Sequence, residues 1–307
     1  MGYLVDVGTT LTYHESKKHI DGIKKDGIIQ FLNLFKKFKN VEGTGQLWGD
    51  ELEYHIVNID PETGKVRIKL TAAEVIPKIQ SDVFEAQFEY GKWMIEAVPK
   101  KPYDVVCDPE PVFENISQRR TEIQKSLDPN DHILPIPVFS LLGVGDYYKS
   151  ADREINQDRV VVTNSDVTSA YKEEEKTIST EKEDLNNKIS VLTSTEKTAN
   201  NEFSRSRFVD DEIINAHPRF PTLTRNLRLR RGSPMSIKIP IFKDVNTSLE
   251  ATDDEPFPGF IFMDATAFGM GNGCLQQTFS TKNVSNARYL TDQLAVIAPI
   301  MVNIFHW

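Results

Sequence analysis

The stretch Trp48-Gly-Asp-Glu51-Leu-Glu53-Tyr54 decides the fold of this chain, because it has the pattern of a strand with two carboxylates. Residues i and i+2 of a strand point to the same side of a sheet, so Glu51 and Glu53 share a face. A second segment, Glu89-Tyr-Gly-Lys-Trp-Met-Ile-Glu96, also has a strand pattern and ends in a glutamate. Together the two segments predict a sheet with several carboxylates on one face.

Carboxylates gathered on one face need an explanation. Like charges side by side are unfavourable unless water or a cation neutralises them. Glu96 follows Trp93, Met94 and Ile95, a run apolar enough to be buried. A hard cation such as Mg²⁺ takes oxygen ligands and can hold phosphates. A magnesium site and a solvated strand edge with unrelated acids explain the pattern equally well, and the carboxylates alone favour neither.

The composition is that of an ordinary globular protein. The 307 residues are 39% hydrophobic and 26% charged, enough for one large domain or two small ones. A net charge of −9, without a basic block or zinc-finger spacing, argues against a nucleic-acid partner. Only Cys107 and Cys274 are present, which favours a reducing compartment over a disulfide framework. No basic region precedes an apolar run at the N-terminus, so we expect a cytoplasmic protein without a membrane partner.

The remaining pattern alternates between helices and strands. Thr12-Tyr-His-Glu15 is a capping box that opens a helix with an apolar stripe, extending to about Asn40. The turn Pro61-Glu-Thr-Gly64 joins two strand patterns in a hairpin. Strands are expected at 52–59, 66–70, within 83–97, at 133–138, 236–242 and from 260, and helices at 113–127 and 285–303. The last helix is apolar enough that we expect it to pack in a core.

Residues 150–203 differ from the rest in composition. They alternate lysine and glutamate, are rich in serine, threonine and asparagine, and hold few large apolar side chains. Such a segment cannot bury enough surface to offset chain entropy. We expect a charged, disordered insertion between residues 1–149 and 204–307, although Ile178, Leu185, Ile189 and Leu192 would allow a marginal helix.

An arginine-rich segment and a glycine-rich loop follow the insertion. Residues 217–232 hold five arginines whose guanidinium groups suit phosphate or carboxylate, and Arg225 and Arg228 are our phosphate-binding candidates. A surface helix whose arginines pair with acids explains this segment equally well. The loop Phe268-Gly-Met-Gly-Asn-Gly-Cys-Leu-Gln276 lets backbone approach a ligand closely, but it matches neither a Walker A loop nor a dinucleotide fingerprint.

In combination, these motifs resemble the eukaryotic glutamate–cysteine ligase catalytic subunit. The matching motifs are Gly27-Ile-Ile-Gln-Phe-Leu, Trp48 to Tyr54, Glu89-Tyr-Gly, Met94-Ile-Glu96, His217-Pro-Arg-Phe-Pro-Thr-Leu-Thr-Arg-Asn, Ile239-Pro-Ile-Phe-Lys-Asp, Met263-Asp-Ala and Phe268-Gly-Met-Gly-Asn. They span residues 10–299 apart from the insertion, which looks like that of a fungal member. The resemblance implies an α+β fold similar to glutamine synthetase, with a curved antiparallel sheet forming a funnel and helices packed outside.

The resemblance also implies a function, the first step of glutathione biosynthesis. In this family ATP phosphorylates the γ-carboxylate of glutamate, and the amino group of cysteine then attacks the γ-glutamyl phosphate. The implied partners are Mg²⁺, ATP, glutamate, cysteine, glutathione as feedback inhibitor and a possible modifier subunit. A related carboxylate–amine ligase with another amine substrate, and an inactive or regulatory fragment, remain as alternatives.

Site residues carry over from the family only at matching positions. The implied Mg²⁺ ligands are Glu51, Glu53, Glu89, Glu96 and Gln276. The implied neighbours of the amino-acid substrates are Met270, Asn272 and Cys274. A small buried residue is the alternative interpretation of Cys274.

Two features depart from the family pattern. The segment Phe139-Ser-Leu-Leu142-Gly143 lacks an arginine that the family usually has before the glycine. Members are also considerably longer, and the match ends at Val302. We therefore expect a C-terminally truncated chain with an incomplete sheet, which lacks substrate-binding arginines and a further metal-coordinating glutamate. We expect a chain of this length to have no ligase activity.

Overall fold

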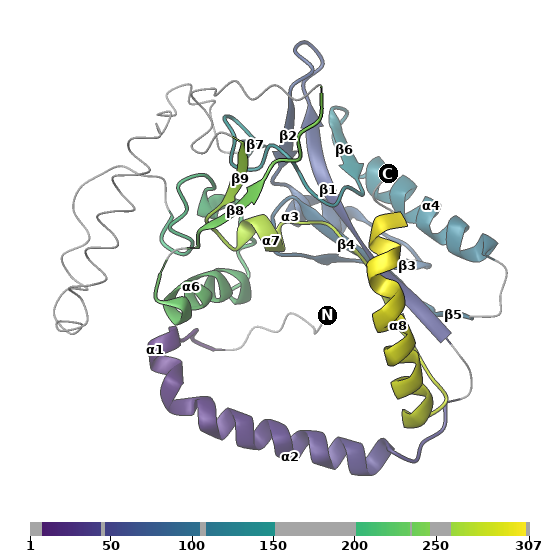
Figure 1. Cartoon of the computed structure of the whole chain (residues 1–307). Coiled ribbons are helices and arrows are strands. Elements are labelled where there is room, and N and C mark those ends of the chain that lie inside the picture. Colours follow the sequence, from purple (N-terminus) through teal and green to yellow (C-terminus); the bar gives the residue numbers. More distant parts are fainter. Residues whose placement is uncertain are drawn as a thin grey trace, which may run out of the picture.

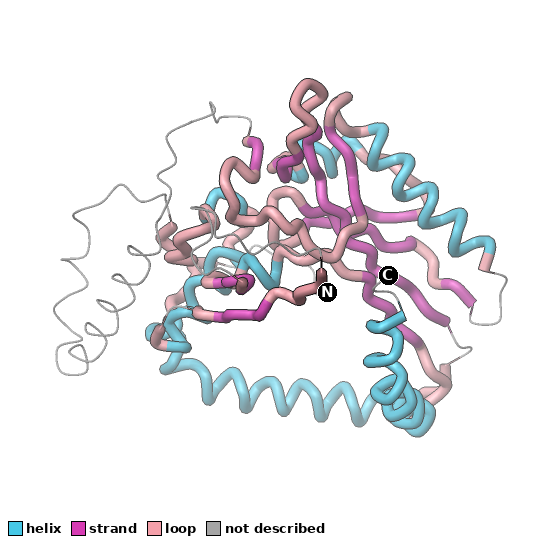
Figure 2. The backbone as a smooth tube through the Cα atoms, turned by 45° about the horizontal axis from the view of Figure 1, so that its top comes forward, coloured by secondary structure: helices cyan, strands magenta, loops and turns pink. Residues whose placement is uncertain are grey.

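The computed structural model describes residues 8–43, 47–104, 109–150, 201–233, 235–245 and 259–304. Almost all of the expected insertion at 150–203 lies outside the described residues, as does Cys107. The described part is an α+β fold, in which a curled, mostly antiparallel sheet is flanked by helices (Figures 1 and 2). The expected fold class is therefore confirmed.

A sheet of eight strands is organised around one long strand, β1 (Leu47–Ile59). Five strands pair antiparallel with β1: β2 (Val66–Lys69), β4 (Met94–Pro99), β5 (Tyr103–Asp104), β6 (Asp131–Leu134) and β10 (Leu275–Phe279). Strand β3 (Phe84–Phe88) extends the sheet beyond β4, and β7 (Tyr148–Lys149) pairs parallel with β2. The two glutamate segments of the sequence thus lie on or next to neighbouring strands.

The long strand continues directly into the predicted hairpin. Val57 of β1 lies opposite Ile68 of β2, and Gly64 in the connecting turn has a φ of 67°, which a glycine adopts without strain. The Asp60 carboxylate accepts hydrogen bonds from the backbone N–H groups of Glu62 and Thr63 and so fixes the turn. The hairpin prediction is confirmed.

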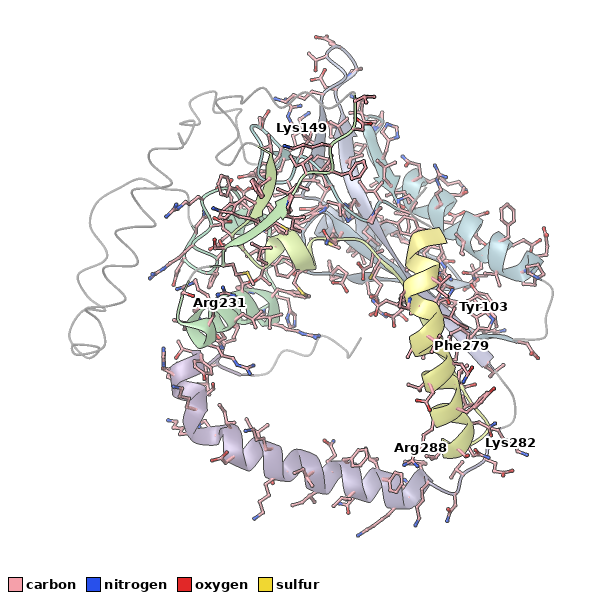
Figure 3. All side chains as sticks on the ribbon, in the orientation of Figure 1. Tyr103, Lys149, Arg231, Phe279, Lys282 and Arg288 are labelled. Atoms are coloured by element: carbon pink, nitrogen blue, oxygen red, sulfur yellow. The ribbon has the colours of Figure 1, made fainter. Side chains whose placement is uncertain are left out.

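The two faces of the sheet support two separate cores, as the period of two along a strand requires. Tyr54 and Ile56 of β1 pack on one side with Ile123 of the helix α4 (Glu110–Lys125). Val57 packs on the other side with Phe220 of α6 (Arg219–Arg231). At the start of β1, Trp48 packs against the rings of Tyr103 and Phe279. Figure 3 labels these two partners.

The remaining elements are short. They are α3 (Ala72–Val75), α7 (Ala267–Met270), the 3₁₀ helices η1 (Lys17–His19), η2 (Ile76–Lys78) and η3 (Asp211–Ile213), and a two-stranded sheet of β8 (Ile237–Pro240) and β9 (Phe260–Met263). Pro240 is the last residue of β8, a strand of this two-stranded sheet, and edge strands tolerate a residue without an N–H donor.

Two helices at the periphery differ in part from the sequence expectations. The capping box at Thr12 is present and begins α1 (Tyr13–Ser16), and α2 (Ile20–Phe38) ends where predicted. The apolar stripe of α2 is exposed, as at Phe31, which has 63% of its surface accessible. Helix α8 (Val284–Ile304) was expected in a core, and that prediction was wrong, because side chains such as Val296 are exposed. No described helix combines the length and apolar character that a membrane crossing requires.

Candidate functional site

The register of the strands gathers acidic and amide side chains on one face of the sheet. Glu53 of β1 lies directly opposite Glu96 of β4, which in turn lies opposite Gln87 of β3. On the neighbouring strand pair, Glu51 of β1 lies opposite Gln276 of β10. Directly opposed residues share a face, with Cβ atoms about 4.5–5.5 Å apart. Strand pairing alone therefore collects four of the five residues that the resemblance implies as metal ligands.

The fifth residue, Glu89, is brought to the same place by the turn between β3 and β4. Its carbonyl oxygen accepts a hydrogen bond from the Asn215 side chain (3.0 Å), and its carboxylate accepts one from the Tyr90 N–H (2.9 Å). In this position Glu53, Glu89 and Glu96 each offer one carboxylate oxygen, and the three oxygens lie within 4.8 Å of one another. All three glutamates are at least 95% buried.

Burial and mutual repulsion change the acidity of this cluster. Burial is the largest cause that raises the pKa of Glu96, to about 8, and the charges of Glu51, Glu89 and Glu53 add to it. The pKa of Glu89 is also raised, first by burial and then by the charge of Glu53, against the lowering effect of the Tyr90 hydrogen bond. Without a cation, the cluster therefore retains a proton near neutral pH.

The donor set fits a hard divalent cation. Glu89 Oε1 and Glu96 Oε2 are buried, and neither has a hydrogen-bond partner among the described residues. A buried acceptor without a partner costs free energy, and a cation coordinated by these oxygens would remove that cost. The Gln276 amide donates to Glu53 Oε1 (3.3 Å), and a 180° rotation of that amide would offer its oxygen instead.

The raised pKa of Glu96 predicts a pH dependence of stability in the metal-free chain. Folded Glu96 keeps its proton up to about pH 8, whereas a glutamate in the unfolded chain loses it near its model value of 4.5. Between these values the folded state holds more protons, so the free energy of unfolding decreases as the pH rises. We expect the melting temperature in EDTA to fall between pH 6.5 and 8, and this fall to be smaller in Glu96→Gln.

The lower limit of that pH window is set by His55. Burial lowers the pKa of His55 from 6.5 to about 4, so His55 makes stability rise with pH between these two values. Above pH 6.5 this opposing contribution is complete, and the difference between the wild-type chain and Glu96→Gln then reports the acidic cluster. Parallel pH profiles of the two proteins over this window would contradict the prediction.

Among the implied substrate-pocket residues, Cys274 contacts the acidic cluster. Its backbone N–H and its thiol donate to the two Glu53 carboxylate oxygens, at 3.1 and 3.0 Å. Burial and this contact with Glu53 raise the pKa of the thiol to about 12. The side chain is exposed overall, so the alternative of a small buried residue is wrong. Asn272 is exposed in the same loop, whereas Met270 packs partly against the core.

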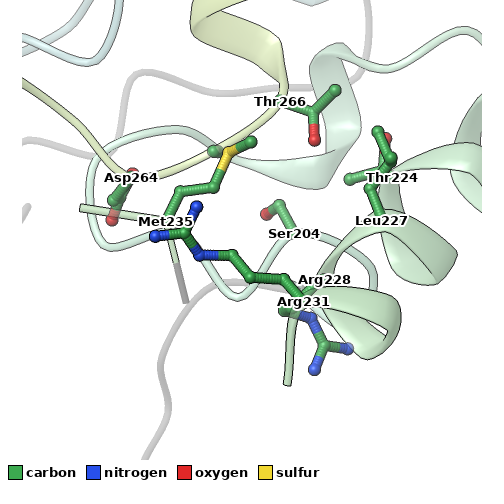
Figure 4. Close-up of a pocket in the computed structure, with 9 residues that line it drawn as sticks. Ser204, Thr224, Leu227, Arg228, Arg231, Met235, Asp264 and Thr266 are labelled. Atoms are coloured by element: carbon green, nitrogen blue, oxygen red, sulfur yellow. The ribbon is translucent and has the colours of Figure 1, made fainter. Parts of the chain in front are cut away.

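The two arginines predicted to bind phosphate lie elsewhere on α6. Arg228 donates to the carbonyl oxygens of Glu202 and Phe203 and, with Arg231, lines a small pocket (Figure 4). Arg225 lies near Glu15: the pKa of that carboxyl is lowered mainly by its hydrogen bonds with Thr12, and the charge of Arg225 adds to this effect. These contacts place neither arginine against the glutamate cluster, and their binding of phosphate stays a prediction.

A different arginine of the same segment influences the cluster. Arg219 is exposed at the start of α6, and its positive charge offsets a small part of the rise that burial causes in the pKa of Glu89. The sequence indicated an arginine-rich helix, but its pattern could not indicate which arginine faces the acids. Gln87 was also missed, although its two-residue spacing from Glu89 is the same signal that singled out Glu51 and Glu53.

The comparison with known protein families gives a match over nearly the whole chain. Residues 2–305 match the family model described as glutamate-cysteine ligase. The chain belongs to the glutamate–cysteine ligase family. The resemblance drawn from the motifs is thereby confirmed at the level of the family.

Individual members of the glutamate–cysteine ligase family are similar along the same length. The chain is 35% identical over 317 residues to the human glutamate–cysteine ligase catalytic subunit, and 32% identical over 329 residues to the Candida albicans glutamate–cysteine ligase. These alignments cover 97% and 98% of this chain but 43% and 41% of the two relatives. The chain thus spans less than half the length of these two relatives.

Proposed function

We propose that this chain carries the metal and nucleotide-phosphate part of a glutamate–cysteine ligase active site. The reaction would be the ATP- and Mg²⁺-dependent joining of the γ-carboxylate of L-glutamate to the amino group of L-cysteine, the first step of glutathione biosynthesis. The observation that supports it best is the meeting of Glu53, Glu89 and Glu96, whose carboxylate oxygens lie within 4.8 Å of one another. Membership of the family supplies the reaction class.

Each residue of the cluster has a proposed role. Glu53, Glu89 and Glu96 would hold the cation, and Glu51 and Gln276 would complete its ligands from the neighbouring strand pair. Mg²⁺ bound there would neutralise the phosphate charge of ATP and of the γ-glutamyl phosphate. Carboxylates coordinate a cation in their ionised form. Glu96 and Glu89 would therefore release a proton when the cation binds.

Other residues of this chain would act on the substrates. Cys274 orients the Glu53 carboxylate through its N–H and thiol, and with Asn272 and Met270 it would border the amino-acid pocket. Arg219 would offer positive charge to a phosphate or carboxylate that approaches Glu89. For Arg225 and Arg228 we keep a role in phosphate binding as a weaker proposal, because their contacts lie away from the cluster.

The organisation of the chain supports a single ligase domain interrupted by the insertion at 150–203. Strand β10, from the C-terminal part, pairs with β1, from the N-terminal part, and the two strands share the site. The human relative is named a catalytic subunit, which supports a modifier subunit as a partner of this chain too. Glutathione as a feedback inhibitor and a cytoplasmic location complete the proposal.

Growth of a glutathione-auxotrophic yeast tests the proposed reaction. We expect growth without glutathione from a chimaera in which the remaining length of the Candida albicans relative follows this chain. The same chimaera with Glu53→Ala is the matched control and should not support growth. Purified chimaera should convert glutamate, cysteine and ATP to γ-glutamylcysteine, with cysteine preferred over other amines. A soluble chimaera that makes no γ-glutamylcysteine would refute the assignment, and a preference for another amine would favour the related carboxylate–amine ligase.

A further inference from the structure

The indole ring of Trp93 lies between two backbone segments that meet at the candidate metal centre. Trp93 follows the turn that holds Glu89 and precedes β4, which carries Glu96, and it is completely buried. A Cβ atom placed on Gly91 would overlap the indole Cζ3 atom. A Cβ atom placed on Gly271 would lie 2.9 Å from the indole Cζ2 atom. Both segments approach the ring this closely because each has a glycine at the point of contact.

His55 supports the ring and the same loop from β1. Its imidazole meets the indole edge-on, with ring centroids 6.2 Å apart and an interplanar angle of 87°. A Cβ atom placed on Gly273 would lie 2.6 Å from the Ile136 carbonyl oxygen and 3.0 Å from His55 Nε2. The two glycines of the loop, Gly271 and Gly273, therefore rest on an aromatic platform formed by Trp93 and His55.

The platform determines where the neighbouring loop meets the cluster. The loop continues from Gly273 to Cys274, whose carbonyl oxygen accepts a hydrogen bond from the Glu53 N–H (3.0 Å). The Cys274 N–H and thiol donate back to the Glu53 carboxylate. A shift of the loop relative to the platform would thus move the groups that orient Glu53. A shift of Gly91 would move Glu89, two residues earlier in the chain.

The polar ring atoms of Trp93 and His55 indicate that the platform does more than fill space in the core. Trp93 Nε1 and both ring nitrogens of His55 are buried, and none of them has a hydrogen-bond partner among the described residues. Each such group costs free energy that a hydrocarbon side chain of similar size would not. Sites that break a local packing rule in this way are more often functional than ordinary core positions.

We propose that Trp93, supported by His55, is a positioning residue of the metal centre. Its ring fixes the distance between the turn at Glu89 and the loop at Cys274. At this distance Glu53, Glu89 and Glu96 can share one cation. This role rests on the proposed function, because it presupposes that the three glutamates bind a cation. Residues that hold metal ligands in place typically contribute about 10–100-fold to affinity when they are removed.

Calorimetric titration of the 307-residue chain with Mn²⁺ alone, as a substitute for Mg²⁺, tests the role. Trp93→Leu should weaken Mn²⁺ binding about tenfold or more. The matched control is Phe84→Leu, which shortens a buried aromatic residue in the other core, away from both glycine contacts. The control should lose a similar amount of thermal stability but keep its Mn²⁺ affinity within about twofold, because no metal ligand depends on it.

A double-mutant cycle with Gly91→Ala sharpens the test. The three atoms nearest to a Cβ added at Gly91 all belong to the Trp93 ring, whereas the atom nearest to one added at Gly271 is the Ala267 carbonyl oxygen. Gly91→Ala should therefore weaken Mn²⁺ binding in the wild-type chain but have little further effect when Trp93→Leu has already removed the ring. If the losses of Mn²⁺ affinity in the two single variants simply multiply in the double variant, the positioning role is overturned.

The possible results separate the two proposals. Equal losses of Mn²⁺ affinity in Trp93→Leu and Phe84→Leu would show a purely structural residue and overturn the inference. Unchanged affinity in Trp93→Leu would overturn it as well, while leaving the metal centre in place. A wild-type chain that binds no Mn²⁺ would overturn the metal centre of the proposed function and, with it, the positioning role.

Discussion

Glu53→Gln and Glu96→Gln should each abolish cation binding while leaving the metal-free chain at least as stable as the wild type. Glutamine keeps the size of the side chain and removes its charge. In the metal-free cluster that charge repels the neighbouring carboxylates. Its loss removes the repulsion that, together with burial as the larger cause, raises the pKa of Glu96 to about 8. In the cation-bound cluster the same charge is a ligand, so its loss removes both an oxygen donor and part of the counter-charge.

The effect on catalysis should be larger than the effect on binding. In the chimaera with the Candida albicans relative, we expect Glu51→Ala, Glu53→Ala and Glu96→Ala to lower turnover by orders of magnitude, because phosphate charge would lose its counter-ion in the transition state. Glu62→Gln, an exposed acid in the β1–β2 turn, is the matched control and should change neither Mn²⁺ affinity nor turnover. Cluster variants that stay fully active at saturating Mg²⁺ would refute the ligand roles.

The acidic face could be predicted because it rests on local rules. The alternation of Glu51 and Glu53 along a strand needs only the two-residue period of β structure. The burial of Glu96 follows from the apolar run that precedes it, and the structure confirms both its burial and its position in a strand. The capping box at Thr12 and the hairpin turn were also local signals, and both are present.

What the sequence did not predict depends on contacts between distant residues. That Glu53 lies opposite Glu96 is a matter of register between strands, which a single strand pattern does not contain. Glu89 joins them only because Asn215, far along the chain, holds its turn. The family resemblance supplied these members of the site before the geometry could be known.

Helix α8 shows a second reason why a prediction from the sequence can be wrong. Its apolar residues predict burial, but a pattern states only which side chains would gain from burial and not what covers them. In the described part of the chain, Tyr289, Val296 and Ile300 are more than half exposed. For the arginines of α6 the sequence has a similar limit, because charge in a sequence does not indicate which acid or carbonyl each guanidinium meets. The phosphate-binding role of Arg225 and Arg228 stays a prediction.

A buried ion pair that the strand patterns did not indicate joins α4 to the start of β1. All five N–H groups of the Arg119 guanidinium donate: two to the Asp50 carboxylate, and one each to the Ala97 carbonyl, the Tyr103 hydroxyl and the Asn115 side chain. The side chain of Arg119 is 0% exposed and that of Asp50 is 2% exposed. Asp50 immediately precedes Glu51, so this pair anchors the metal-centre strand from the opposite face of the sheet.

Removal of one partner from this pair should give the largest loss of stability in the chain. Arg119→Met would leave the Asp50 carboxylate buried without its counter-charge, and we expect the free energy of unfolding to fall by about 3–5 kcal/mol. Arg119→Lys should recover only part of this, because an ammonium group cannot reproduce the two-pronged contact with Asp50. The double variant Arg119→Met with Asp50→Leu should be more stable than Arg119→Met alone, since no unpaired charge remains.

Urea unfolding at pH 7 measures these differences, and the same helix provides the control. Lys125 pairs with Glu122 at 3.0 Å on the exposed side of α4, with 64% of the lysine side chain accessible. Lys125→Met should therefore cost less than about 1 kcal/mol, because water screens an exposed pair and solvates the remaining charge. The exposed control should have a free energy of unfolding within about 1 kcal/mol of the wild type. If Arg119→Met also lies within that range, the ion pair does not anchor β1. The position of Glu51 would then be fixed by strand pairing alone.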